Sequence, residues 1–156
     1  MDFQDYFELS QLYARYAQAV SSSEWELWPE FFTEDCVYRL QPRENHDRGF
    51  PLATLSFESK GMLKDRVYGA AETIFHDPYW QRHVVGAPRI LGSDERGLRC
   101  EASYVVIRTK RDAMPEILSV GRTIDRVVET AEGLRFAERH IVFDNDIVPN
   151  SIVDPI

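Results

Sequence analysis

Residues 117–128 read ILSVGRTIDRVV, a run in which small or polar residues alternate with larger ones. Successive side chains of a strand point to opposite faces, so this run predicts a strand with a small-residue face and a bulkier face. Neither face is wholly polar, which indicates that protein covers both, helices on one side and a partner chain on the other. The alternative is a pocket wall on the small-residue face, which carries Ile117, Ser119, Gly121, Thr123, Asp125 and Val127.

Three more strand-like runs flank this one, at 84–91, 98–109 and 134–143. The segments between the runs are rich in Gly, Asp and Pro, which favours hairpin connections. The chain therefore ends in a series of antiparallel strands. Residues 144–156 carry no helical pattern but contain several Ile and Val side chains, so we expect this tail to dock on the rest of the chain.

Helical spacing dominates the N-terminal half. Apolar residues recur every three or four positions over 3–20 and over 59–74, which predicts two helices. A short kinked helix with Trp25 and Trp28 should lie between them, starting from a capping box of Ser23 and Glu26. A strand over 35–40 and a polar loop over 41–49 complete this half. Helices followed by strands predict an α+β fold with the helices on one face of a strongly bent sheet.

Length, charge and composition exclude some classes of function. The length of 156 residues fits one domain over 1–156, and the net charge of −8 repels nucleic acid. No run of about 18 uncharged apolar residues is present, so we expect no membrane span. Two cysteines and no N-terminal signal pattern indicate a cytoplasmic protein.

The sequence lacks the Cys and His spacing of the known iron sites. A Rieske cluster needs two Cys and two His, whereas Cys36 and Cys100 lie far apart without a nearby His at ligand spacing. A mononuclear site needs two His and a carboxylate, but the four histidines are scattered. The four histidines are His46, His76, His83 and His140, and none repeats at i and i+4 on a helix. We therefore expect neither metal nor cofactor in this chain.

Acid–base chemistry in a cavity is the second candidate. The plausible groups are His83, His140, Asp125 and Tyr38, since a His with an Asp or Tyr can remove and return a proton. A His on a mostly apolar strand is more often a hydrogen-bonded structural residue. The residues alone leave both readings open.

Several segments resemble known proteins. Residues 13–17 (YARYA), 23–28 (SEWELW) and 31–38 (FFTEDCVY) resemble the opening of the nuclear-transport-factor-2-like superfamily. That resemblance implies a cone-shaped fold, with N-terminal helices packed on a strongly curved, mostly antiparallel sheet. The superfamily includes enzymes and non-catalytic proteins, so the fold alone does not decide function.

Further segments resemble the small (β) subunits of Rieske non-heme iron aromatic ring-hydroxylating dioxygenases. They are ENHDRG, KGMLKDRV, YWQRHVVG, GRTID and LRFAER, at 44–49, 60–67, 79–86, 121–125 and 134–139. Scytalone-dehydratase-like enzymes carry an aspartate four residues before the tryptophan of the second helix, where this chain has Ser21. That difference argues against a dehydratase.

This resemblance implies a structural subunit without catalytic residues. A large (alpha) subunit would hold the Rieske [2Fe-2S] cluster and the mononuclear non-heme Fe(II), in an assembly of three large and three small subunits. Its substrate would be an aromatic compound, and the branch acting on acids such as salicylate or terephthalate fits best. Because Arg is enriched at interfaces, the interface candidates are Arg66, Arg82, His83, Arg122 and Arg139.

Two other functions remain as alternatives. One is a free-standing dehydratase, isomerase or cyclase that uses His83 or His140 together with Asp125 in a pocket. The other is a non-enzymatic adaptor unrelated to oxygenases.

Overall fold

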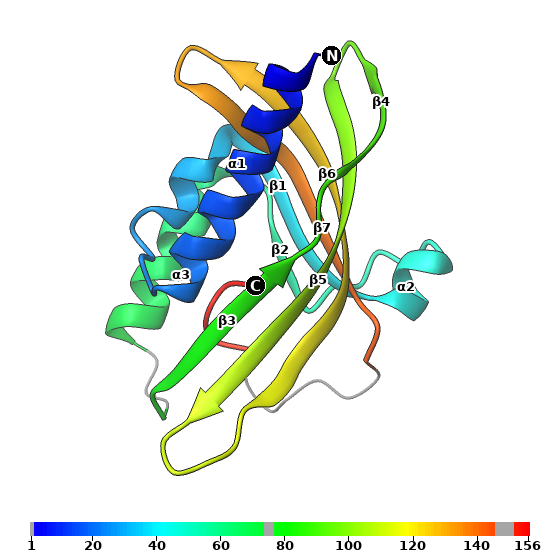
Figure 1. The fold of residues 1–156 in the computed structure, drawn as a ribbon. Helices are drawn as coiled ribbons and strands as arrows, with labels where there is room; N and C mark the ends of the chain where they lie inside the picture. Colours follow the sequence, from blue (N-terminus) through cyan, green and yellow to red (C-terminus); the bar gives the residue numbers. More distant parts are fainter. Residues whose placement is uncertain (1, 74–76, 146–151) are drawn as a thin grey trace.

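The computed structural model describes residues 2–73, 77–145 and 152–156. Within them, seven strands form one curved sheet, and α1 lies across its concave face with α3 beside it (Figure 1). The helices are α1 (Phe3–Ser21), the 3-10 helix η1 (Trp28–Phe31), α2 (Arg43–Asp47) and α3 (Lys60–Glu72). The strands are β1 (Phe32–Pro42), β2 (Leu55–Phe57), β3 (Tyr79–Val85), β4 (Arg89–Asp94), β5 (Gly97–Lys110), β6 (Glu116–Thr130) and β7 (Gly133–Phe143).

The sheet has the order β2-β1-β7-β6-β5-β3. Strand β4 lies off this path and pairs with β5. All pairs are antiparallel except β1 with β7, which run parallel. The predicted α+β architecture with a mostly antiparallel sheet is confirmed. We call the space between the concave face and the helices α1, η1 and α3 the cone interior.

Helix α1 begins at a capping box. The Asp2 carboxylate accepts a hydrogen bond from the Asp5 main-chain N–H at 3.0 Å, and the Asp5 carboxylate accepts one from Asp2 N–H at 2.9 Å. These bonds satisfy donors that a helix start leaves without partners. The apolar stripe of the helix faces the sheet, with Leu9, Leu12, Tyr13, Tyr16, Ala19 and Val20 buried.

The predicted capping box of Ser23 and Glu26 is wrong. Ser23 has a φ of 58°, a left-handed conformation that belongs to a turn and not to a helix start. The helical segment begins later, as a 3-10 turn from Trp28 with Pro29 in its first turn. Pro29 fits there because the first helical N–H groups have no intrahelical acceptor.

Other element boundaries also differ from the prediction. The expected loop at 41–49 contains α2, and the expected strand at 84–91 is divided into β3 and β4. Pro88 explains the division, because it has no N–H for a strand ladder. The helix predicted over 59–74 is α3, with Ser59 as its N-cap, whose Oγ accepts from Met62 N–H at 3.2 Å. Ile74 lies outside the described residues.

Aromatic rings fill the core between α1, η1 and the sheet. Trp28 and Tyr38 meet edge to face with ring centroids 5.3 Å apart, and Tyr16 and Phe136 do so at 5.7 Å. Edge-to-face contacts are a favoured geometry, because the positive edge of one ring meets the negative face of the other. This packing holds α1 and η1 on the concave face.

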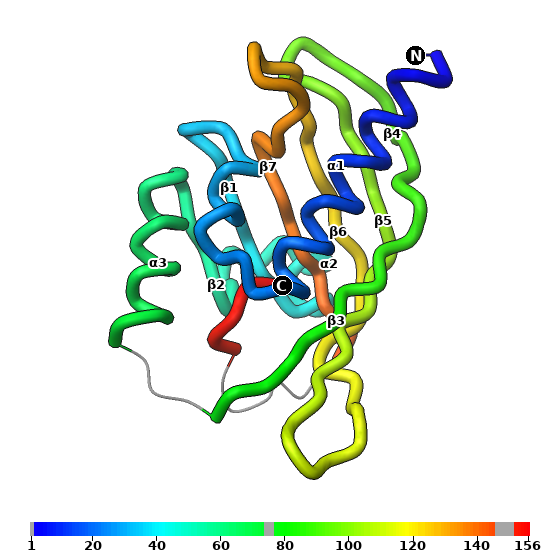
Figure 2. The backbone as a smooth tube through the Cα atoms, turned by 60° about the vertical axis from the view of Figure 1, so that its left-hand side comes forward, coloured from blue at the N-terminus to red at the C-terminus, as the bar shows by residue number. Residues whose placement is uncertain are grey.

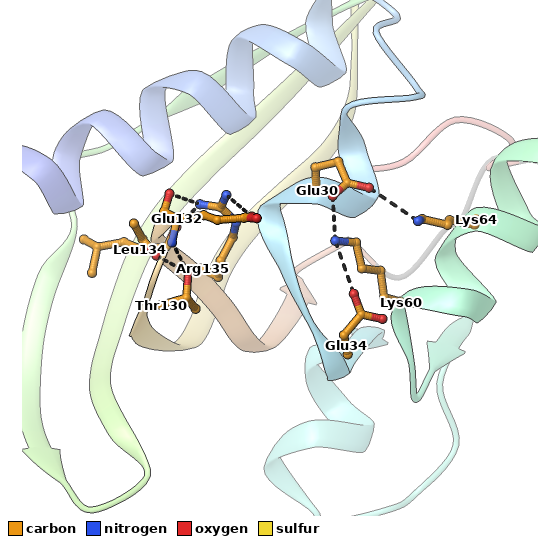
Figure 3. A network of polar contacts seen from close by, with 9 residues as sticks. Glu30, Glu34, Lys60, Lys64, Thr130, Glu132, Leu134 and Arg135 are labelled. Atoms are coloured by element: carbon orange, nitrogen blue, oxygen red, sulfur yellow. Dashed lines mark hydrogen bonds and ion pairs between the residues drawn. The ribbon is translucent and has the colours of Figure 1, made fainter.

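An ion-pair cluster fixes α3 next to the start of β1. Lys60 Nζ lies 2.6 Å from Glu30 Oε2 and 3.6 Å from Glu34 Oε1, and Lys64 approaches the other Glu30 oxygen at 3.5 Å (Figure 3). The Lys60 side chain is only 11% exposed, so its ion pairs are less screened than ordinary surface pairs. Among the described residues, no helix is both long and apolar enough to cross a membrane.

Candidate functional site

A buried ion pair lies at the centre of the cone interior. Asp125 on β6 and Arg139 on β7 are register partners, and Arg139 Nη1 lies 3.1 Å from Asp125 Oδ2. Tyr13 and Thr123 donate their hydroxyl protons to the same oxygen, at 2.6 and 2.7 Å. The Arg139 guanidinium also lies over the Tyr16 ring, 4.2 Å from its centroid. Burial raises the pKa of Asp125, while Arg139 and the two hydroxyl donors oppose that rise.

His83 also points into the interior, from the inner face of β3. Its main-chain N–H donates to Ser21 Oγ at 2.9 Å, and its Nδ1 lies 3.5 Å from the same oxygen. Burial, followed by the charge of Arg139, lowers the pKa of His83 to about 3. The ring is therefore neutral at physiological pH. Its Nε2 is buried and has no hydrogen-bond partner among the described residues.

The third candidate base lies on the other side of the sheet. Side chains alternate along β7, so Arg139 points inward and His140 outward, where His140 is in register with Arg39 of β1. Burial lowers the pKa of His140 as well. The structure thus brings His83 and Asp125 into the same interior but does not bring His140 to them.

The predicted small-residue face of β6 points inward over most of its length. Ser119, Thr123 and Asp125 are each less than 5% exposed. The pairing shifts by one residue between Val106 and Ile107 of β5, so the predicted face does not extend to Ile117, which is 69% exposed. The helices cover this face, as predicted for one side of the strand.

The tail docks as expected where it is described. Val153 and Ile156 are 4% and 2% exposed, and Tyr16 and Tyr38 both donate their hydroxyls to the Ile156 main-chain oxygen at 2.9 Å. Tyr38, the fourth acid–base candidate, is therefore occupied by this contact. The tail residues Ile147 and Val148 lie outside the described part of the chain.

The described residues contain no group of three His, Cys, Asp or Glu side chains arranged to hold a metal ion. His76 is not among the described residues. Cys36 and Cys100 are buried free thiols, and burial raises their pKa to about 11 and about 12.

The five interface candidates fall into two groups. Arg139 and His83 lie in the interior, and Arg66 donates from α3 to the Ile152 and Val153 carbonyl oxygens at 2.9 and 3.0 Å. Contacts within the chain therefore hold both Arg139, through Asp125, and Arg66, through the tail, and Arg122 also has intramolecular ion pairs. Arg82 and Arg122 lie on the outer face of the sheet. Arg122 approaches Glu101 at 3.6 Å and Asp47 at 3.8 Å.

Around Arg82 the outer face carries an apolar surface that the sequence reading missed. Trp80, Val84 and Ile117 are 68%, 55% and 69% exposed. Arg82 is in register with Ile107 of β5, which is in register with Ile117, so these side chains share one face. We call Trp80, Arg82, Val84 and Ile117 the outer patch. A strand predicted at 79–85, and not at 84–91, would have placed Trp80, Arg82 and Val84 on one face and so indicated this surface.

Comparison with known proteins gives consistent results. The model of the SnoaL-like domain family matches residues 1–140. The small subunit of anthranilate 1,2-dioxygenase from Burkholderia cepacia is 30% identical over 155 residues, covering 99% of this chain and 96% of that protein. The first β subunit of the terminal oxygenase component of terephthalate 1,2-dioxygenase from Comamonas sp. is 28% identical, covering 96% of this chain and 97% of that protein.

Solved structures agree with the sequence relatives. A protein from Novosphingobium aromaticivorans, assigned as the β subunit of an aromatic-ring-hydroxylating dioxygenase, superposes with a TM-score of 0.86 at 31% identity, over 95% of this chain and 94% of that one. The β subunit of benzoate 1,2-dioxygenase from Burkholderia mallei gives a TM-score of 0.77 over 99% and 98% of the chains. Its 11% identity supports the likeness of fold alone.

Proposed function

Because this chain belongs to the SnoaL-like domain family and, within it, to the small subunits of aromatic-ring-hydroxylating dioxygenases, we propose that it supports a large subunit that performs the hydroxylation. The likeness over 99% of the chain to the anthranilate dioxygenase small subunit carries the proposal. In this assignment the large subunit holds the Rieske [2Fe-2S] cluster and the mononuclear Fe(II). The present chain supplies no ligand to either and is inactive in isolation.

The interior of the chain fits a supporting role. One Asp125 oxygen receives Arg139, Tyr13 and Thr123, so the carboxylate is held by structural partners. Of the two candidate bases, His140 lies on the outer face, and His83 in the interior has its main-chain N–H and its Nδ1 directed at Ser21 Oγ. Those contacts favour the scaffold over the free-standing dehydratase, isomerase or cyclase.

The outer patch is the surface we assign to assembly. It combines large exposed apolar side chains with Arg82, and aromatic residues and Arg are enriched in the cores of protein interfaces. We propose three large and three small subunits around a three-fold axis, so that each small subunit contacts its own kind and the large chain. The chain acts there as one domain over 1–156, in the cytoplasm.

An aromatic acid is the proposed substrate class of the complex. The named relatives belong to dioxygenases of anthranilate and terephthalate, both of which are aromatic carboxylates. The substrate pocket belongs to the large subunit, so the residues of this chain do not select among such acids.

Coexpression with a Rieske large subunit of an aromatic-ring-hydroxylating dioxygenase tests the assignment. We expect a stable complex that contains iron and hydroxylates an aromatic acid, whereas the chain purified alone contains no stoichiometric iron and does not hydroxylate the acid. Hydroxylation or stoichiometric iron binding by the isolated chain would contradict the proposal.

The pocket-enzyme alternative has its own test. His83→Gln and His140→Gln are introduced singly into the coexpressed complex, and turnover is measured per assembled complex. We expect wild-type turnover for both, because neither residue touches the reacting atoms. A large loss of turnover in a fully assembled His83→Gln complex would favour the alternative.

A further inference from the structure

A groove hollows one end of the molecule. It lies between the start of α1, the turn that joins β4 to β5 and the hairpin that joins β6 to β7, which gather at the same end in both views (Figures 1 and 2). Its volume is about 710 Å³, and we call it the end groove. Buried or partly buried apolar side chains form its floor: Leu9, Ile90, Leu98, Val127 and Leu134.

The rim of the end groove is acidic. Five exposed carboxylates and one guanidinium line it, so it carries much of the net charge of −8. Contacts within the chain use some of these carboxylates, since Asp94 accepts from Arg126 at 2.5 Å and Asp5 belongs to the capping box. Glu95 and Glu129 form no ion pair within the described residues. The end groove therefore fits a partner that presents an apolar side chain next to cations.

The opposite end of the molecule presents such a feature. Strand β5 begins beside the end groove and ends at Lys110, about 40 Å away at the usual rise of a strand. The turn that follows projects from the lower end of the molecule in both views (Figures 1 and 2). All of residues 110–115 are exposed, and we call them the basic hairpin.

The basic hairpin combines an apolar tip with cations. Met114 lies at the tip and is 86% exposed. Lys110 and Arg111 stand next to the tip and form no ion pair within the described residues. Residues 110–115 contain one acid, Asp112, so the segment is positive on balance in a chain that is negative overall.

The two ends complement each other, but one copy cannot bring them together. Continuous pairing of β5 with β6 fixes their separation, so the basic hairpin reaches an end groove only on another copy. A single exposed Met needs no explanation of its own. Here, however, the same chain carries an apolar floor with an acidic rim, and the flexible Met side chain adapts well to irregular apolar surfaces.

We propose that the basic hairpin of one copy inserts Met114 into the end groove of a second copy, with Lys110 and Arg111 facing Glu95 and Glu129. Because two different surfaces form the contact, it is head-to-tail and repeats from copy to copy until a ring closes. Closure at three copies rests on the proposed function, whereas the contact itself does not. The outer patch stays free for the large subunit in this arrangement.

A disulfide between the two surfaces tests the contact. Ser93→Cys in the end groove and Met114→Cys are combined in one chain. The complex coexpressed with the large subunit and the chain alone are both oxidised with copper phenanthroline. A disulfide requires Cα atoms within about 7 Å, so these positions cannot be joined within one copy. We expect covalent dimers and trimers of this chain on a non-reducing gel.

The chains with one added cysteine are the controls. In a head-to-tail contact neither position meets its own equivalent, so neither Ser93→Cys nor Met114→Cys alone should form covalent oligomers. Cys36 and Cys100 are buried and should not contribute. Absence of covalent trimers from both preparations overturns the inference, as does equal linking by a chain with one added cysteine.

Charge reversal in the chain with both cysteines tests the pairing of the two surfaces. Lys110→Glu with Arg111→Glu makes the basic hairpin acidic, and Glu95→Lys with Glu129→Lys makes the end groove basic. Either change brings like charges together, and we expect the yield of covalent trimer to fall about tenfold or more. The four substitutions together exchange the two signs, so the yield should recover. Failure to recover, in a chain whose circular dichroism spectrum is native, contradicts the proposed pairing.

Glu24→Lys with Glu26→Lys is the matched control for charge. Both acids are exposed and line neither surface, and the change in net charge equals that of the reversed end groove. The yield of covalent trimer should equal that of the chain with both cysteines. An equal loss of trimer in this control would show that net charge, and not the contact, governs association.

Copurification with the large subunit separates this inference from the proposed function. If the chain copurifies but forms no covalent trimers, the inference is wrong and the proposed function stands. If covalent trimers form but the chain does not copurify, the proposed function is contradicted and the contact stands.

Discussion

Arg139 and Asp125 form an ion pair at 3.1 Å in which the two side chains are 3% and 0% exposed. The pair connects β7 to β6, and Tyr13 ties it to α1. A charge removed from water is tolerated only where partners and hydrogen bonds compensate for its lost hydration. The buried charges are therefore fully compensated only when β6, β7 and α1 are all in place.

Removal of one member of this pair should destabilise the protein strongly. Asp125→Leu leaves the Arg139 charge buried without compensation, and we expect the free energy of unfolding to fall by about 3–5 kcal/mol. Arg139→Met should cost a similar amount. The double variant should lose much less than the sum, because no buried charge remains. Urea unfolding of the four chains gives the coupling energy.

The exposed pair Arg48 and Glu44 is the control for that cycle. These side chains are 62% and 67% exposed and lie 3.2 Å apart. Glu44→Gln should change the free energy of unfolding by less than about 1 kcal/mol. Additive losses at Asp125 and Arg139 would show that their pairing is not the source of the effect.

Gly121 should tolerate no side chain. A Cβ built there would lie 2.0 Å from the Val142 carbonyl oxygen and 2.9 Å from the Phe143 Cα, both backbone atoms of the adjacent strand. Gly121→Ala must therefore move one strand, and we expect a loss of about 3 kcal/mol or more in the free energy of unfolding.

Gly69→Ala in α3 is the comparison for that substitution. A Cβ there meets its nearest neighbour, Thr73 Oγ1, at 3.8 Å, and alanine favours a helix over glycine by about 1 kcal/mol. We expect this variant to be as stable as the wild type or more so. Equal stability of the two variants in thermal unfolding would refute the close approach at Gly121.

His83 should make stability depend on pH. Its pKa falls from 6.5 to about 3 on folding, so the unfolded chain binds a proton there before the folded chain does. The contribution of neutral His83 to the free energy of unfolding is fully present above about pH 6.5 and is lost as the pH falls toward 3. The free energy of unfolding then changes by at most about 1.4 kcal/mol per pH unit.

Urea unfolding at pH 5, 6 and 7 measures this slope. His83→Gln should flatten it, because glutamine does not titrate. His140→Gln should have a weaker effect of the same sign, since burial lowers the pKa of His140 as well. An unchanged slope in the His83→Gln chain would mean that His83 is charged or accessible in the folded state.

The outer patch should control assembly without controlling folding. Trp80 is 68% exposed, so Trp80→Ser removes little intramolecular packing, and the same holds for Arg82→Glu on this face. We expect both variants to weaken copurification with the large subunit about tenfold or more, as interface anchors do, while the Tm of the chain stays within about 2 °C.

Tyr68→Ser provides the matched control on another surface. Tyr68 is 66% exposed on α3, so it is an aromatic residue of similar exposure outside the outer patch. Copurification of this variant should equal that of the wild type. If Trp80→Ser assembles as well as Tyr68→Ser, another surface mediates the contact.

Much of the local structure could be predicted because it depends on neighbours in sequence. The apolar stripe of α1 and the strand runs of β5, β6 and β7 follow from periodicity, and their predicted bounds lie close to those observed. The capping box could not be placed in the same way, since Ser23 and Asp2 both have suitable neighbours three residues on. The backbone conformation separates the two, because Asp2 is extended whereas Ser23 is left-handed.

The sequence by itself determined the class of fold, the lack of metal-ligand spacing among the histidines, and the small-residue face of β6. Each of these follows from the order of residues along the chain and from side-chain alternation, which are local properties. Only the tertiary structure decided which groups meet. Strand register placed Arg139 against Asp125 and turned His140 to the opposite face. Packing of distant elements also carried Ile156 to Tyr16, 140 positions away, since the burial of both requires a hydrogen-bond partner that no nearby residue supplies.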